Sequence, residues 1–317
     1  MTITDIITEF GAYYLNHGQN LKDLVKQLYR KSVTDMLFTT MTTEDTVIRK
    51  SDARITRILQ PFQKQFTPIG TLSFKPVTIP LFEMKIDASE YPDELERSWL
   101  GFLADQDLDR QKWPFVKWFI TEHILPRAEE DYELNEVYAG VYAAPTPGTA
   151  GAAGTAMDGI RKIINDWIDD GRTTPIVTGA PDSDPQTFVE QIEDFVAQID
   201  TRYWKETMVI AMNESLELRY RKGMRAKYNM QYLQEPNTST LADFKNITIA
   251  GMPSMVGDDK IWCTPKWNAV VGVKKKANQN AVQLEGEDRK VKLWSDWYKG
   301  VGFIIPELIF TNDQDLV

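Results

Sequence analysis

The sequence predicts an α+β protein in which strands and helices occupy separate stretches of the chain. Three observations predict this class. Residues 44–90 alternate apolar and polar side chains, as strands do. Residues 113–199 carry apolar side chains at helical spacing. Beyond residue 207, short apolar runs are separated by Gly and Pro, which indicates strands joined by turns.

Composition and charge exclude several classes of protein. The 317-residue chain is 42% hydrophobic and 26% charged, which is typical of a folded globular protein. Its net charge of −10 argues against a protein that coats nucleic acid with a continuous basic face. One cysteine cannot form an internal disulfide, which fits a reducing cytoplasm, and one cysteine with two histidines is too few for a structural zinc site. The N-terminus lacks a signal-peptide pattern, and the longest uncharged run, residues 137–157, is broken by Pro and Gly. We therefore expect no metal, no cofactor and no membrane anchor.

Residues 1–43 are expected to form an arm. Leu21, Leu24, Val25 and Leu28 have helical spacing and predict one short amphipathic helix. The rest of this stretch is rich in Thr and has little apolar bulk for a core of its own. A loose terminus is the alternative interpretation.

Residues 44–90 predict a long β-hairpin. Pro61, Pro68, Pro76 and Pro80 exclude a central strand, because each proline removes a ladder donor. An isolated two-stranded hairpin is marginal in water, so this one should rest on something else.

Residues 91–138 predict acidic helices, and two more helices are expected after the Gly- and Ala-rich stretch 139–156. Pro114 suits the first turn of a helix that we expect over residues 113–138, and Pro126 should kink or divide it. A second apolar stripe runs through residues 157–168, and a third follows Asp184, an expected N-cap, with Pro185 in the first turn.

The remaining chain predicts mostly strands. Within residues 206–283 a short buried strand and a basic helix precede three strands cut by turns. Residues 284–317 predict two more strands, one near Val291 and one from Val301.

The residues give little support to catalysis. Gly148, Gly151 and Gly154 precede a helix, but no Lys-Ser or Lys-Thr follows them as in a phosphate-binding loop. His17, His123 and Cys263 are not arranged as a nucleophile with its base. The alternating acids Asp105, Asp107 and Asp109 lack the glycine and the distal glutamate of a calcium loop. The sequence therefore predicts no catalytic residue, and the chain is not expected to be an enzyme.

Charge is distributed unevenly between the hairpin and the helices after it. Residues 44–85 contain seven Lys or Arg and four acids, whereas residues 87–136 contain five Lys or Arg and fourteen acids. Opposite charges set register and partner choice between surfaces. We expect basic hairpin residues of one copy to lie over an acidic block of the next copy. The basic residues are Arg49, Arg54, Arg57, Lys64 and Lys75, and the acidic block is Glu129, Glu130, Asp131 and Glu133. Packing within a single chain is the alternative.

Three stretches resemble the major capsid protein of tailed phages, the Hong Kong 97 type fold. "MVIAMNESLELRYRKGMRAKY" (208–228) resembles its strand followed by a helix with spaced arginines. "NITIAGMPSMVGDDKIWCTPKWNAVVGV" (246–273) resembles its strands with a glycine turn and Thr-Pro-Lys. "VKLWSDWYKGVGFIIPELIF" (291–310) resembles its terminal strands. The resemblance covers nearly the whole chain, with its parts in the same order.

The resemblance implies five parts of the chain. They are an N-terminal arm (1–43), an extended hairpin (44–90), a peripheral domain with its spine helix at about 113–138 (91–205), an axial domain (206–283) and C-terminal strands returning to the peripheral domain (284–317). Trp262, Trp267, Arg219 and Arg225 would make contacts in the axial domain.

The resemblance also implies what the chain assembles with. Pentamers and hexamers of this chain would close an icosahedral shell around double-stranded DNA, contacted non-specifically, as part of a virion assembled in the host bacterial cytoplasm. A portal and a separate scaffolding protein are expected partners. An encapsulin-like nanocompartment shell is the alternative, and a nucleotide-binding enzyme using residues 148–154 is a further one.

Overall fold

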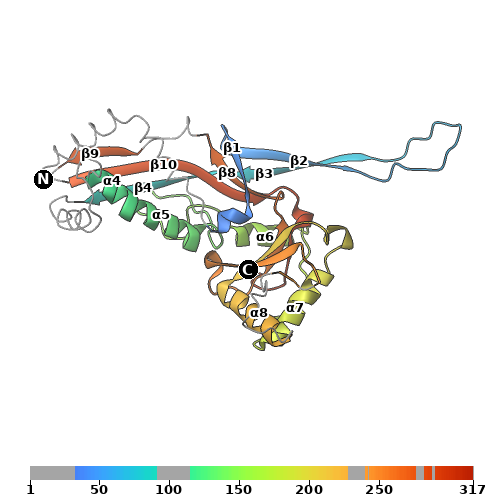
Figure 1. Cartoon of the computed structure of the whole chain (residues 1–317). Coiled ribbons are helices and arrows are strands. Elements are labelled where there is room, and N and C mark those ends of the chain that lie inside the picture. The colour runs from blue at the N-terminus through green and yellow to red at the C-terminus, as the bar shows by residue number, and fades with distance from the viewer. Residues whose placement is uncertain are drawn as a thin grey trace.

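The computed structural model describes residues 33–90, 115–227, 240–241, 243–275, 282–287 and 290–316. Figure 1 shows a long narrow sheet with a helix along it, a compact lobe below one end of the sheet, and a hairpin that projects beyond that end. The helix expected around Leu21, the acids Asp105 to Asp109 and His17 lie outside the described residues.

The long sheet contains five strands in the order β1-β8-β10-β4, with β9 pairing β10. These strands are β1 (Thr39–Thr43), β4 (Phe82–Glu90), β8 (Ala269–Lys274), β9 (Gln283–Glu287) and β10 (Lys290–Phe303). Only the β1–β8 pair of this sheet is parallel. The two strands expected within residues 284–317 are thus one continuous strand, β10, which spans the sheet and pairs with three others.

The helix along the long sheet is continuous through Pro126, so the proline does not divide it. It comprises α4 (Phe115–Phe119), the π-helical turn η2 (Ile120–Ile124), α5 (Leu125–Asp131) and the π-helical turn η3 (Tyr132–Glu136). The N–H of Leu125 donates to the carbonyl of Ile120, five residues back. This wider turn lies directly before Pro126 and relieves the clash that a proline ring makes with the carbonyl four residues earlier.

The compact lobe contains a four-stranded sheet in the order β11-β7-β5-β6. Its strands are β5 (Met208–Asn213), β6 (Ile247–Met252), β7 (Trp262–Pro265) and β11 (Phe310–Thr311). Helices α7 (Pro185–Ala197) and α8 (Glu214–Lys227) pack on it, and their apolar residues share one core with β5 and β6. The N-cap at Asp184 is confirmed, since its side chain accepts a bond from Thr187 N at 3.0 Å. A Cβ on Gly223 would lie 1.9 Å from Pro185 O, so only glycine permits this approach of α8 to α7.

Helix α6 (Ile160–Asp169) and short 3₁₀ turns join these parts. The turns are η1 (Thr34–Leu37), η4 (Thr201–Tyr203), η5 (Pro253–Met255) and η7 (Pro306–Leu308). A second core packs α6 against residues of both sheets, including Trp262 and Phe303, and against Phe38, which lies between η1 and β1. The long sheet and the lobe are therefore joined by a shared apolar core.

The hairpin is shorter than the expected range of residues 44–90. Strands β2 (Val47–Ile55) and β3 (Leu72–Pro80) pair antiparallel, from Val47 opposite Pro80 to Ile55 opposite Leu72. Leu81 N then donates to Thr46 O, and β4 runs into the long sheet beside β10. Because Pro80 has no N–H to continue the ladder with β2, the pairing changes partner at this point.

The C-terminal residues also differ from expectation. Strands β9 and β10 belong to the long sheet, but β11 pairs β7 of the compact lobe, and Asn312 bridges to Ile176. Strand β8, expected in the axial part, lies instead in the long sheet between β1 and β10. Local patterns identified these strands, but their partners depend on residues far away in the sequence.

Candidate subunit-interface surfaces

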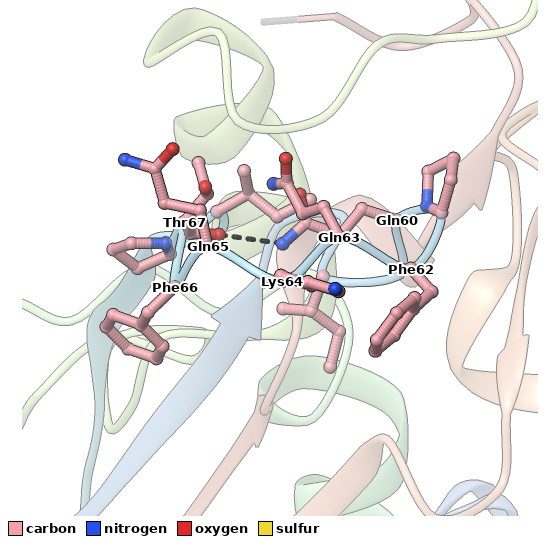
Figure 2. Close-up of a pocket in the computed structure, with 11 residues that line it drawn as sticks. Gln60, Phe62, Gln63, Lys64, Gln65, Phe66 and Thr67 are labelled. Carbon is pink, nitrogen blue, oxygen red and sulfur yellow. Dashed lines mark hydrogen bonds between the residues drawn. The ribbon is translucent and has the colours of Figure 1, made fainter.

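The hairpin tip, residues 56–71, exposes large apolar side chains. Leu59, Phe62 and Phe66 are 84%, 91% and 90% exposed. Figure 2 shows the two phenylalanine rings projecting on either side of Lys64. No acidic residue occurs from position 53 to 82. Large contiguous apolar patches on a protein surface mark interaction sites.

The shape of the tip is held by its own hydrogen bonds. Thr56 N donates to Thr71 O at 3.2 Å, and Thr71 N donates to Thr56 Oγ1 at 2.8 Å, which closes the base of the loop. Across the loop, Gln60 Nε2 donates to Thr67 O at 2.7 Å (Figure 2). The apolar side chains are thus presented on a formed loop. Sequence reasoning did not single them out, although the missing acids and the two phenylalanines were a usable signal.

The base of the hairpin lies directly on the long sheet. Ile48, Ile79 and Leu81 form an apolar cluster with Val270. Glycines in the underlying strands make room for it: a Cβ on Gly302 would lie 2.8 Å from Ile79 side-chain atoms. Likewise, a Cβ on Gly272 would lie 2.7 Å from Ile48 Cδ1, and one on Gly300 would lie 2.1 Å from Pro80 O. We call this contact the glycine seat.

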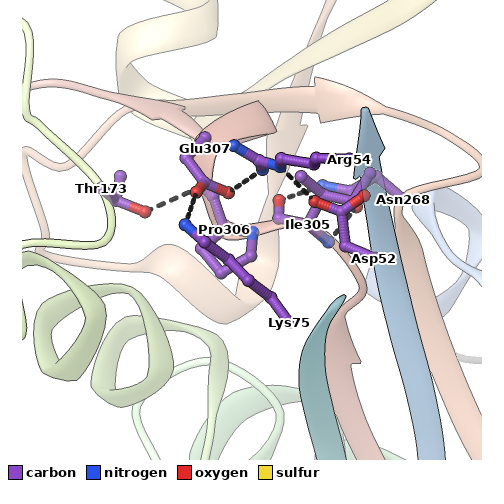
Figure 3. A network of polar contacts seen from close by, with 8 residues as sticks. All are labelled: Asp52, Arg54, Lys75, Thr173, Asn268, Ile305, Pro306 and Glu307. Carbon is purple, nitrogen blue, oxygen red and sulfur yellow. Dashed lines mark hydrogen bonds and ion pairs between the residues drawn. The ribbon is translucent and has the colours of Figure 1, made fainter. Parts of the chain in front are cut away.

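Further out, both strands of the hairpin bind one carboxylate (Figure 3). Arg54 of β2 lies 2.6 Å from Glu307 Oε2, and Lys75 of β3 lies 3.0 Å from Glu307 Oε1. Asp52 accepts a further bond from Arg54 Nε. This bond is the main cause that raises the pKa of Arg54. Partial burial acts to raise the pKa of Glu307, but hydrogen bonds from backbone, Lys75 and Arg54 outweigh it and lower the pKa. We call this group the Glu307 clamp.

The clamp corrects part of the expectation for the basic residues. Arg54 and Lys75 pair within their own chain, because β2 and β3 pass beside the turn η7 that carries Glu307. Arg49 of β2 pairs at 2.9 Å with Asp45, which lies in the connection between β1 and β2 of the same chain. Arg57 and Lys64 are exposed, and no ion pair is found for them within the described part of the chain.

The four residues of the acidic block do not share one surface in the structure. Glu130 and Asp131 are bound by Arg127, each at 3.0 Å, and Glu129 is part-exposed. Glu133 is 8% exposed and accepts bonds from Thr34 N at 3.1 Å and Thr34 Oγ1 at 2.5 Å. Glu133 therefore binds the start of η1 inside its own chain, and its expected place on an acidic outer face is wrong.

The two tryptophans expected to make contacts in the axial domain lie in different environments. Trp262 is 1% exposed and packs against Phe38 and Phe303, with ring centroids 6.0 and 5.7 Å away. It is a core residue because β7 turns its side chain into the core shared with the long sheet, so the predicted subunit contact is wrong. Trp267 is 48% exposed, and its contact stays a prediction.

Arg219 and Arg225, two of the three arginines of α8, bind carbonyls of their own chain. Arg219 donates to Asp182 O at 2.7 Å and lies over the Phe188 ring. Arg225 Nε donates to Arg221 O at 3.2 Å. Both are part-exposed, and their role between subunits stays a prediction.

Several solved structures with this arrangement of elements are phage capsids. A chain of the satellite phage P4 procapsid including size determination (Sid) protein matches with a TM-score of 0.59 and 9% identity, over 92% of this chain and 89% of that one. The capsid of Myoviridae phage XM1 matches with a TM-score of 0.57 and 12% identity, over 88% and 90%. Mycobacterium phage Che8 matches with a TM-score of 0.51 and 9% identity, over 89% and 91%. The chain has a phage capsid protein fold. At the level of sequence, no protein-family model and no curated protein matches it.

The glycine loop of this capsid fold binds a carboxylate of its own chain. Glu136 accepts bonds from Gly154 N at 2.8 Å and Ala156 N at 2.9 Å. The amides that a phosphate would need at this end of the loop are therefore occupied. This arrangement gives the nucleotide-binding alternative no support.

The other candidate reactive residues are spread through the capsid fold. His123 is exposed and its ring lies 4.7 Å from Trp118. Cys263 is buried, and this burial raises the pKa of its thiol. Within the described ranges, no group of three or more His, Cys, Asp or Glu could hold a metal ion. Over the same residues, no helix has both the length and the apolar character needed to cross a bilayer.

Proposed function

We propose that this chain is the major capsid protein of a tailed phage with the Hong Kong 97 type fold. Copies assemble as pentamers and hexamers into an icosahedral shell that encloses double-stranded DNA. A portal and a separate scaffolding protein take part, and the DNA is contacted non-specifically. The fold supports this proposal, because the phage capsid structures P4, XM1 and Che8 match it over most of their length.

One observation within the chain carries the proposal. The hairpin tip presents Phe62 and Phe66 at about nine-tenths exposure. A hairpin that leaves such side chains in water is completed by a surface on another molecule. Repeated head-to-tail contacts of this kind generate rings when the rotation closes.

The structure narrows the residues proposed for this contact. Arg54 and Lys75 are engaged by Glu307, so Arg57 and Lys64 are the basic hairpin residues proposed to face the next copy. On the receiving side we keep Glu129, Glu130 and Asp131, because the pairs that Glu130 and Asp131 make with Arg127 are solvent-exposed and can exchange partners, whereas Glu133 is buried. The apolar tip supplies most of the binding free energy, and the charges set the register.

A shortened hairpin tests the proposal. Replacing residues 56–71 by Asn-Gly connects Ile55 to Leu72, which already face each other in the ladder, through a favoured two-residue turn. We expect the shortened chain to fold and to stay monomeric in analytical ultracentrifugation, whereas the full chain sediments as large particles. Closed shells from the shortened chain would contradict the proposal. The contents of full-length particles, DNA or an enclosed protein, distinguish a phage capsid from a nanocompartment shell.

A further inference from the structure

The hairpin is attached to the body of the protein at two separate points. The inner point is the glycine seat, where Ile48 and Ile79 lie on β8 and β10. The outer point is the Glu307 clamp, which binds Arg54 and Lys75. From Ile48 to Arg54 the strand advances about 20 Å, since each residue of a strand adds about 3.3 Å. Two attachments this far apart fix the direction of the hairpin relative to the body, whereas a single attachment would let the hairpin rotate about it.

The carboxylate of the clamp is held on a firm support. Glu307 lies in the turn η7, whose flanking residues are tied to other elements (Figure 3). Thr173 Oγ1 donates to Pro306 O at 2.8 Å, and Thr264 Oγ1 donates to Leu308 O at 2.9 Å. Asn268 Nδ2 donates to Ile305 O at 3.0 Å, and Ile305 N donates to Asn268 Oδ1 at 2.7 Å. The clamp therefore ties the hairpin to the compact lobe as well as to the long sheet.

The two attachments differ in strength. The seat is apolar and buried, since Ile48 and Ile79 are 7% and 2% exposed. The clamp is part-exposed: the side chains of Arg54, Lys75 and Glu307 are 39%, 56% and 35% exposed. Ion pairs at such exposure are weak and are screened by salt. The outer attachment can thus open while the inner one stays closed.

We propose that the Glu307 clamp is a reversible latch that sets the direction of the hairpin by holding Arg54 and Lys75. With the latch closed, the hairpin keeps one direction relative to the compact lobe. With the latch open, the hairpin swings about the glycine seat. In a shell, and here the inference rests on the proposed function, this direction sets the angle between neighbouring copies and hence the size of the particle.

Distances between two spin labels test the latch in unassembled full-length protein. One label is attached at the tip through Gln65→Cys and the other on the lobe through Val177→Cys, both at exposed positions. The native Cys263 is buried, and its burial-raised pKa keeps the thiol protonated and poorly reactive to the label. Pulsed electron paramagnetic resonance then gives the distribution of distances between the labels.

With the latch intact we expect one narrow distribution at low salt. Glu307→Gln, and separately Glu307→Ala, should at least double its width. Sodium chloride at about 1 M, where the screening length is about 3 Å, should broaden the unmodified chain and leave the variants unchanged. Asp87→Asn is the matched control, because it removes an exposed ion pair with Lys85 that lies wholly within β4 and does not involve the hairpin. If the distance distributions of Glu307→Gln, of Glu307→Ala and of the unmodified chain at high salt are all as narrow as that of the unmodified chain at low salt, the latch proposal is wrong.

Particle diameters provide a second and separate result. If shells form, electron micrographs of Glu307→Gln should show a wider range of diameters than those of the unmodified chain. Uniform diameters would overturn the link between the latch and shell size. If the unmodified chain forms no particles at all, the proposed function fails, while the label distances still decide whether the latch exists.

Discussion

Removing the two phenylalanine rings of the hairpin tip should greatly weaken assembly while leaving the folded chain intact. The double variant Phe62→Ser with Phe66→Ser changes side chains that are 91% and 90% exposed. Surface changes of this kind alter the free energy of unfolding by about 0.5 kcal/mol or less. The chain should therefore unfold thermally at nearly the same temperature as the unmodified protein.

The effect on assembly follows from the surface that the rings lose. Complete burial of one phenylalanine side chain stabilises a contact by about 1.5–3 kcal/mol. Two rings per hairpin then contribute about 3–6 kcal/mol. Each 1.4 kcal/mol corresponds to about tenfold in an equilibrium constant. The contact between two copies should weaken by a factor of at least about 100.

Light scattering against protein concentration measures this factor as a shift in the concentration at which particles appear. The matched control is Phe62→Tyr with Phe66→Tyr, which keeps both rings and should assemble close to normal. An unchanged threshold in the serine variant would refute the role assigned to the tip. Loss of folded structure in circular dichroism would refute the claim that the rings serve another molecule.

Three further changes test how the body of the protein is held together. Gly302→Val places side-chain atoms against Ile79 in the glycine seat, and overpacking of this kind should lower the free energy of unfolding by about 1–3 kcal/mol, measured by urea titration. Glu136→Ala removes the acceptor for two loop amides and should cost about 1.5–3 kcal/mol, with faster hydrogen exchange at Gly154 as its local sign. Burial lowers the pKa of Lys260 from 10.5 to about 8, so unfolding takes up a proton between these values. The free energy of unfolding should therefore rise as pH increases from 8 to 10.5, and Lys260→Met should rise less over this range. Equal pH dependence in both proteins, or full stability of either of the first two variants, would contradict these contacts.

Local patterns predicted many elements of the fold. Alternation and prolines predicted the hairpin, and Asp184 with Pro185 predicted the start of α7. Each of these features depends on residues close together in the sequence. A resemblance in the order of motifs predicted the capsid fold, which the solved phage capsids then matched.

The predictions that proved wrong concern residues whose partners lie far away in the sequence. Glu133 appears in an acidic run, yet its partner Thr34 lies 99 residues away, and no local pattern encodes that pairing. Trp262 lies beside turns that suggested a surface, but its neighbours Phe38 and Phe303 come from the two ends of the described chain. The basic residues Arg54 and Lys75 were correctly taken as charged hairpin residues, while Glu307 is separated from Arg54 by 253 positions. Composition identified the charges but not which charges meet.

Cryo-electron microscopy of the purified full-length protein can show whether the hairpin tips lie on neighbouring copies. We expect closed particles in which the tip of each hairpin, with Phe62 and Phe66, is buried on a neighbouring copy. A field of single, separate molecules at high protein concentration would contradict it. Particles in which every tip remains in solvent would contradict it equally.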